Sequence, residues 1–152
     1  MKKFYVVLIV LIALIGCFAG WYLASPLFFD KVVNEDIIEA SPNDNSQATL
    51  ISQGSFMNAD GFHKTKGTVK IVEKESKRYV VFEDFEATNG PDLKVYLSND
   101  KEASDYISLG DLKGNIGNQQ YELPSEENLE NYEYALIWCE QFSVLFGSAK
   151  LE

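Results

Sequence analysis

The N-terminal region is an uncharged, mostly apolar run that extends from Phe4 to Phe29, directly after Lys2 and Lys3. Its core, FYVVLIVLIALIGCFAGWYLA, is long enough to cross a bilayer as a helix, which takes ~20 residues. A cleavable export signal usually has a shorter apolar region, of ~7–15 residues. The run therefore predicts a membrane anchor over residues 1–29, with residues 4–24 in the bilayer.

The flanks of this run predict its orientation. Because the two lysines precede the span, the N-terminus is expected in the cytoplasm and the rest of the single-pass protein outside the cell membrane. Two alternatives stay open. The segment Leu14–Cys17 is similar to a bacterial lipobox, which would make the chain a lipoprotein through Cys17, although the residues after it are still apolar. The run could also be a cleaved signal.

The charge balance excludes one class of partner. The chain carries 23 acidic and 13 basic residues, a formal net charge of −10. A surface this acidic repels phosphate backbones and anionic headgroups, so no nucleic-acid partner is expected. The remaining partners are the membrane and a redox or cell-surface protein.

The part of the chain after the apolar run divides into two regions. Residues 30–48 are polar and rich in turn-forming residues, which predicts a linker. Residues 49–152 contain short alternating segments such as KGTVKIVE, RYVVFEDF and LKVYLS, separated by turn signals such as Asn89-Gly90-Pro91. Such spacing without a long helical period predicts one all-β domain, a small sandwich or barrel of about seven to eight strands.

A single cysteine, Cys139, lies in the most apolar stretch of this domain, IWCEQFSVLFG. Alternation places it on one face of the strand with Ala135 and Ile137, and both faces are apolar, which predicts a central, buried strand. A reactive thiol needs a nearby cation or helix N-terminus to stabilise the thiolate, whereas its neighbour Glu140 is acidic. Cys139 is thus either a small core residue or a working thiol, and Cys17 in the span cannot pair with it.

Few other residues of the outer segment could carry chemistry. The only histidine, His63, could serve as an axial haem ligand, but it is too few for a blue-copper site. The acidic turn region from Asp84 to Asp92 could hold a cation, although it does not match an EF-hand loop. No catalytic constellation is present, so an enzyme is not favoured, and the sequence names no cofactor and no metal site.

Several blocks, taken in order, resemble the DM-thirteen domain, a small extracytoplasmic β domain found alone in prokaryotes and beside DOMON domains in animals. The blocks are GSFMNADGFHKTKGTVKI, FEDFEATNGPDLKVYLS, LGDLKGNIGNQQYELP and ALIWCEQFSVLFGSAKL. The resemblance covers about residues 50–151. It implies a role in electron transfer or redox reactions, with the cysteine of the WCxxF block, here Cys139, as the suspected centre. His63 and Asp92 are the polar matching positions that could assist such a site.

Two functional hypotheses follow. The first is a membrane-anchored extracytoplasmic redox or electron-transfer module centred on Cys139. The second is a non-catalytic cell-surface binding or structural domain in which Cys139 is a buried core residue and the acidic loops carry the function. Accessibility of the thiol in the folded domain separates the two.

Overall fold

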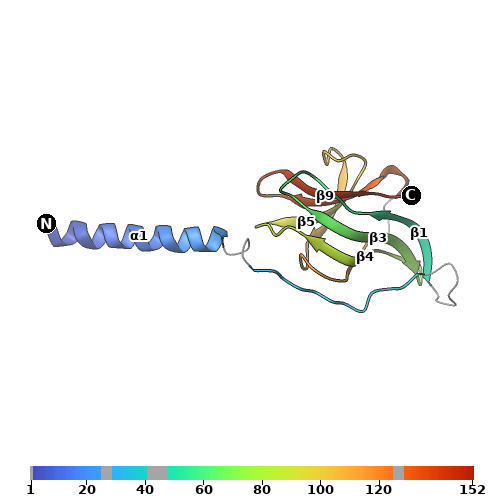
Figure 1. Ribbon diagram of the computed structural model, residues 1–152, viewed down its shortest axis with the longest axis horizontal. Coiled ribbons are helices and arrows are strands. Elements are labelled where there is room, and N and C mark those ends of the chain that lie inside the picture. The colour runs from blue at the N-terminus through green and yellow to red at the C-terminus, as the bar shows by residue number, and fades with distance from the viewer. Residues whose placement is uncertain (1, 25–28, 41–47, 125–128) are drawn as a thin grey trace.

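The computed structural model describes residues 2–24, 29–40, 48–124 and 129–152. Helix α1 (Lys2–Ala24) extends away from a β domain that comprises the rest of the described chain (Figure 1). Among the described residues it is the one helix long and apolar enough to cross a membrane, over Lys3–Tyr22. Its described side chains are exposed, which suits a segment whose solvent is lipid. The helix is compatible with a membrane anchor or a signal sequence.

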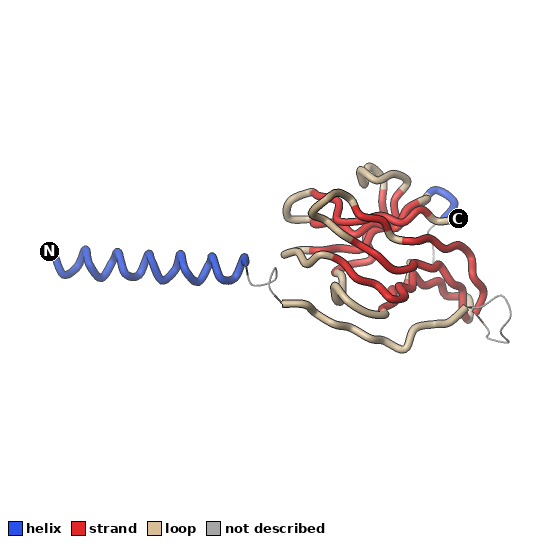
Figure 2. The backbone as a smooth tube through the Cα atoms, viewed as in Figure 1, coloured by secondary structure: helices blue, strands red, loops and turns tan. Residues whose placement is uncertain are grey.

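The β domain is a sandwich of two antiparallel sheets, which confirms the predicted all-β fold (Figure 2). The first sheet has the order β1 (Ala48–Ser55), β3 (Thr65–Lys74), β4 (Lys77–Ala87) and β7 (Gln119–Glu122). The second has the order β2 (Met57–Asn58), β9 (Val144–Lys150), β8 (Tyr134–Cys139), β5 (Leu93–Ser98) and β6 (Tyr106–Asp111). A 3₁₀ turn, Leu129–Asn131, precedes β8.

Local sequence explains the long hairpin β3–β4 in the first sheet. Lys74 pairs with Lys77, so Glu75 and Ser76 form a two-residue turn. Both turn residues have positive φ, 52° and 63°, as a type I′ turn requires. That turn matches the right-handed twist of the flanking strands, so it sets the register between KGTVKIVE and RYVVFEDF at this end.

The core lies between the two sheets and consists of the inward residues of each alternating strand. Its aromatic centre comes from β4 and from Phe56, which lies between β1 and β2. The ring centroid of Phe56 lies 5.0 Å from that of Phe82 and 5.2 Å from that of Phe85, edge to face in both cases. From the second sheet, Ala135, Ile137 and Cys139 join the same cluster. The predicted central position of this strand is confirmed, because β8 lies between β9 and β5.

A segment before β1 packs along the sandwich. Residues 31–40, here called the strap, run beneath β4 from the end nearest the helix toward the opposite end (Figure 1). The N–H of Val33 donates to the carbonyl of Ile116 at 2.9 Å, and the N–H of Glu35 donates to the carbonyl of Asn118 at 2.9 Å. Ala40 is buried in a small cluster on the outer face of the first sheet.

Part of the predicted linker therefore contacts the domain. Of residues 30–48, the described residues 30–40 are in contact with the sandwich through the hydrogen bonds of the strap. Residues 41–47 of that prediction, and residues 1 and 25–28 of the predicted anchor, lie outside the described residues. The division at residues 29 and 48 stays a prediction.

Candidate functional site

Several loops meet at the end of the sandwich from which the chain leads to α1. This helix-proximal end consists of residues 59–64, 88–92, 111–115 and 140–143, together with Phe29. Backbone hydrogen bonds join them: the N–H of Thr88 donates to the carbonyl of Lys64 at 2.8 Å, and the N–H of Glu140 donates to the carbonyl of Asp92 at 3.0 Å. The Asn89 side chain donates to the carbonyl of Phe29.

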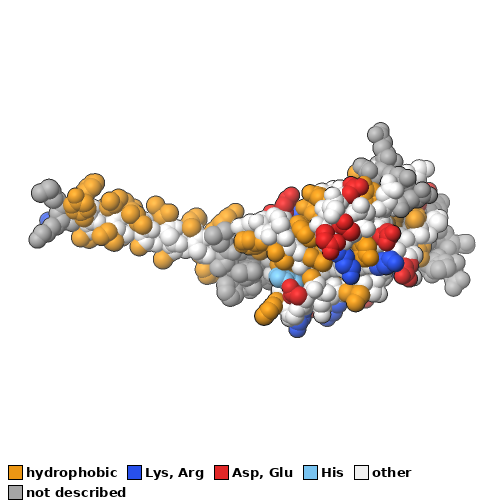
Figure 3. Space-filling model, turned by 90° about the horizontal axis from the view of Figure 1, so that it is seen from above, with side chains coloured by type: hydrophobic (Ala, Val, Ile, Leu, Met, Phe, Trp, Pro, Cys, Tyr) orange, Lys and Arg blue, Asp and Glu red, His pale blue; other side chains and the backbone are white. Residues whose placement is uncertain are grey.

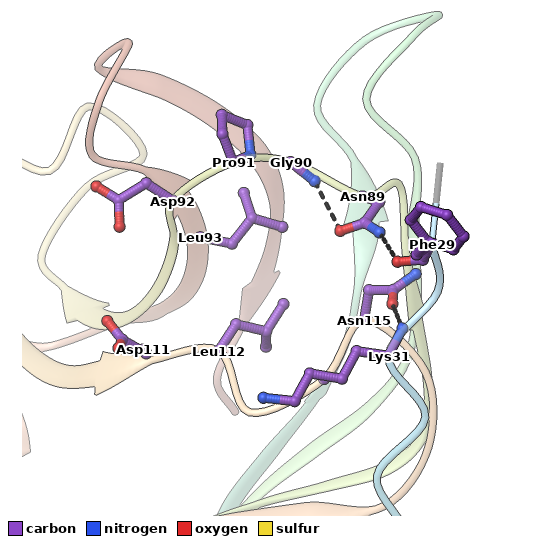
Figure 4. A pocket seen from close by; sticks show the side chains of 11 residues that line it. Phe29, Lys31, Asn89, Gly90, Pro91, Asp92, Leu93, Asp111, Leu112 and Asn115 are labelled. Atoms are coloured by element: carbon purple, nitrogen blue, oxygen red, sulfur yellow. Dashed lines mark hydrogen bonds between the residues drawn. The ribbon is translucent and has the colours of Figure 1, made fainter. Parts of the chain in front are cut away.

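A pocket of about 380 Å³ lies at this end. Figure 4 shows Leu93 and Leu112 in its middle, the carboxylates of Asp92 and Asp111 on one side, and Lys31 reaching in from the other. Its wall thus combines two leucines with charged groups of both signs. The strap contributes Lys31, whose N–H donates to Asn115 Oδ1 at 2.7 Å.

The carboxylates beside the pocket share one cation. Lys94 Nζ lies 3.0 Å from Asp92 Oδ1 and 3.6 Å from Glu140 Oε2, and it also contacts Asp111. The hydrogen bond to Asp111 and then the one to Asp92 raise the pKa of Lys94 above its ordinary value, so the ammonium stays charged. These three carboxylates are therefore partly neutralised by one lysine on β5.

Cys139 is the last residue of β8 and is 0% exposed. In register it lies between Leu93 of β5 and Val144 of β9. Residues directly opposite each other in antiparallel strands have side chains on the same face, with Cβ atoms ~4.5–5.5 Å apart. The thiol therefore has hydrocarbon neighbours on both sides, and in this conformation it is packed as a core residue.

Leu93 connects the buried thiol to the pocket. It belongs to the same core cluster as Cys139, pairs with it across the strands, and also lines the pocket. It is 8% exposed, so its side chain separates the pocket from the core. Leu93 is thus shared by the pocket lining and the core cluster that contains Cys139.

His63 lies at the same end of the sandwich but in a different setting. Its Nδ1 is 2.7 Å from Asp60 Oδ2, and its ring centroid is 4.3 Å from that of Phe146. Hydrogen bonds from the backbone N–H and side chain of His63, followed by the N–H of Phe62, lower the pKa of Asp60 to about 2. The contacts of His63 with Asp60 and Phe146 orient the ring, and Phe146 stands in the core cluster that includes Cys139.

The two acidic residues singled out for a cation site are apart in the structure. Asp84 is exposed at an irregular position of β4 with φ of 49°, and its N–H is bonded to Asn118 Oδ1 near the strap. Asp92 lies at the pocket beside Lys94. Among the described residues, no group of three or more His, Cys, Asp or Glu side chains is arranged to hold a metal ion. Their binding role stays a prediction.

Sequence reasoning missed the polar residues that attach the strap. Lys113 Nζ lies 2.8 Å from Glu35 Oε1 and also donates to the carbonyl of Gln120 at 2.6 Å. The N–H of Gln120 donates to Glu35 Oε2 at 2.9 Å. Desolvation raises the pKa of Glu35, but the bonds from Lys113 and Gln120 outweigh it and hold that pKa below its ordinary value. A glutamate in a turn-rich polar segment gives no sequence signal for such a contact.

Two antiparallel sheets closed over one core, with a cysteine buried behind a polar pocket at one end, define a small β-sandwich module. A family model described as electron transfer DM13 matches residues 55–151. The match covers more than half of the chain, so the protein belongs to the electron transfer DM13 family, as the resemblance to the DM-thirteen domain implied. No curated protein and no solved structure matches the chain.

Proposed function

We propose that this protein is a membrane-anchored, extracytoplasmic module of an electron-transfer system and that Cys139 is its redox group. The observation that carries the proposal is the match to the electron transfer DM13 family over residues 55–151, which includes the WCxxF block. The position of Cys139 supports it, because one leucine separates the buried thiol from a pocket at the end of the sandwich.

The N-terminal helix supports the proposed location. An apolar helix of bilayer length preceded by Lys2 and Lys3 favours an uncleaved anchor with the N-terminus in the cytoplasm. The domain then lies outside, where the chain's net charge of −10 suits an aqueous surface. Acylation at Cys17 after cleavage would keep the domain on the same side of the membrane.

Burial of Cys139 supports a gated mechanism for the proposed redox group. A fully buried thiol between Leu93 and Val144 reacts with a small oxidant such as oxidised glutathione only when that oxidant can enter from the pocket, whereas exposed thiols outside the cytoplasm tend to oxidise or cross-link. A redox partner or cofactor that occupies the pocket reaches the sulfur only when Leu93 moves aside. Reaction is therefore gated by engagement at the helix-proximal end.

The test uses the full-length protein in detergent with Cys17→Ser, so that Cys139 is the one thiol. The protein is equilibrated in glutathione buffers with graded ratios of the oxidised and reduced forms, and mass spectrometry measures the mixed disulfide. In this reaction the Cys139 sulfur bonds to one glutathione and displaces the other as reduced glutathione. We expect reversible formation of the disulfide in the folded protein, faster than global unfolding.

The opposite result would leave Cys139 reduced until the protein unfolds. It would favour the second candidate, a non-catalytic binding module in which Cys139 is a core residue. The observation behind that candidate is the complete burial of the thiol in the main hydrophobic cluster. The pocket, with Lys31, Asp92 and Asp111 around two leucines, would then be the ligand site.

A further inference from the structure

Three phenylalanines at the helix-proximal end are exposed to solvent. Phe29 precedes the strap, Phe62 lies in the loop between β2 and β3, and Phe142 lies in the turn between β8 and β9. Their exposed fractions are 63%, 86% and 63%. In contrast, the other described phenylalanines outside α1 are buried in the core: Phe56, Phe82, Phe85 and Phe146.

Hydrogen bonds place these three rings at one end of the sandwich, although they come from segments far apart in the sequence. The Thr88 hydroxyl donates to the carbonyl of Phe62, and the neighbouring Asn89 donates to the carbonyl of Phe29. The turn that carries Phe142 is tied to the same loop through Glu140. Figure 3 shows hydrophobic side chains protruding beside the single, pale blue histidine at the end of the domain nearest the helix.

The loop that carries Phe62 is ordered by its own hydrogen bonds. Asp60 Oδ1 accepts from the N–H groups of Phe62 and His63, both at 2.7 Å. The phenylalanine is therefore presented on a preformed turn rather than on a loose loop, which reduces the entropy lost when the ring binds a surface.

The opposite end of the sandwich has a different character. The loop from Asn99 to Asp105 carries Asp100, Lys101 and Glu102, and the β3–β4 turn carries Glu75. Exposed phenylalanines in the described part of the β domain thus occur at the helix-proximal end and not at this one. One exposed tyrosine, Tyr106, lies at the opposite end, where its ring stacks on Tyr96 with the centroids 4.2 Å apart. A group of exposed apolar side chains on one end of a domain marks an interaction surface.

The chain itself indicates what covers this surface. Phe29 follows the end of α1 at Ala24 so closely that extended chain allows a separation of at most ~18 Å. Because the strap is bonded to the domain from Lys31 onward, the helix-proximal end cannot swing far from the helix. Because the chain between the helix and the domain is this short, the three rings stay close to the membrane that holds the helix. Their effective concentration at that surface is therefore high, and weak contacts suffice for docking.

We infer that Phe29, Phe62 and Phe142 insert into the outer interface of the bilayer and hold the domain with its helix-proximal end on the membrane. Apolar rings at this depth leave water for the boundary between headgroups and acyl chains. The charges around them are mixed, with Lys31, Lys64, Asp60 and Glu140, and the whole chain is acidic, so the surface suits zwitterionic rather than anionic headgroups. This inference rests on the membrane-anchor part of the proposed function.

The test measures tryptophan quenching by brominated acyl chains in the full-length protein, reconstituted into phosphatidylcholine vesicles. Trp21→Phe serves as the background, and Phe62→Trp or Phe142→Trp adds one reporter at the proposed contact. The matched control is Glu102→Trp, an exposed loop position at the opposite end of the sandwich. We expect loss of most of the added emission for the first two reporters and no loss for the control.

Two other outcomes would overturn the inference in distinguishable ways. Quenching in the unmodified protein that is lost on Trp21→Phe, without quenching of either new reporter, would retain the anchor and reject docking, leaving the three rings to a protein partner. Unquenched Trp21 would reject the anchor and docking together. The thiol chemistry of Cys139 is measured separately in detergent and does not depend on either result.

Discussion

The carbonyl oxygen of Val33 occupies the space that a side chain at Gly117 would need. A Cβ atom on Gly117 would lie 1.9 Å from that oxygen, and Gly117 has φ of +107°. Gly114 is similar, because its Cβ would lie 2.4 Å from the carbonyl oxygen of Lys31. The glycines of the loop before β7 therefore make room for the strap, which lies between α1 and β1 in the sequence.

Gly117→Ala is expected to destabilise the protein by displacing the strap. Gly110→Ala is the matched control, because Gly110 also has positive φ, +95°, but open space around its Cβ position. Both substitutions carry the strain of a left-handed alanine, of about 1–2 kcal/mol. Chemical denaturation should show an additional loss for Gly117→Ala of about 1 kcal/mol or more. Equal losses would mean that the strap contributes nothing to stability.

The bond between Glu35 and Lys113 predicts a pH dependence of the strap. Because the folded-state pKa of Glu35 lies below its ordinary value of 4.5, the stability it contributes is present above pH 4.5 and is lost as the pH falls further. Glu35→Gln should lower the free energy of unfolding at pH 7 relative to the unmodified protein, and the difference should shrink below pH 4.5.

A suitable control for this pH effect is Asp36→Asn, since Asp36 is the next residue of the strap and is exposed. Denaturation curves at pH 7 and pH 3.5 are compared for both variants. The pH dependence expected from Glu35 would be contradicted if the difference in free energy of unfolding between Glu35→Gln and the unmodified protein stays constant or grows on acidification.

The hydrocarbon surroundings of Cys139 predict how its substitution affects stability. Cys139→Ser places a hydroxyl between Leu93 and Val144, and an unsatisfied buried hydroxyl is destabilising by about 1–3 kcal/mol. Cys139→Ala removes the sulfur without adding a polar group and should be milder. Thermal and chemical unfolding measure both. A neutral Cys139→Ser variant would show that the sulfur has polar or aqueous surroundings in solution.

The sequence predicted an all-β domain, a sandwich or a barrel, because its signals are local. Alternation along KGTVKIVE and LKVYLS, and turn residues between the strands, fix the elements, and the apolar strand around Cys139 indicated its central position. The two-residue strand β2 has no such signal, because it is too short to alternate and its partner β9 lies far away in the sequence.

The site was less predictable because it depends on contacts between distant segments. Cys139 could be assigned to the core face by alternation, but the pocket behind Leu93 is formed by the strap, the β4–β5 loop and the β6–β7 loop together. Glycines in a sequence commonly mark turns. In the structure Gly114 and Gly117 have a further role, because they leave room for the carbonyls of Lys31 and Val33. The packing of the polar strap against these glycines produces no periodic pattern in the sequence.

The central claim is that the Cys139 thiol is approached from the pocket through Leu93. It is tested most directly by the rate of alkylation of Cys139 in the folded full-length protein with Cys17→Ser. Leu93→Ala removes the side chain between pocket and thiol, whereas Leu97→Ala, on the same strand and also buried, pairs with Ala135 instead. Each rate is compared with that expected from the variant's own unfolding equilibrium.

The account predicts that Leu93→Ala is alkylated much faster than its own unfolding equilibrium explains. The alkylation rate of Leu97→Ala should equal the rate expected from its unfolding equilibrium. If alkylation in all three proteins follows global unfolding alone, Cys139 is a core residue without a gated route, and the thiol-centred account of electron transfer is wrong.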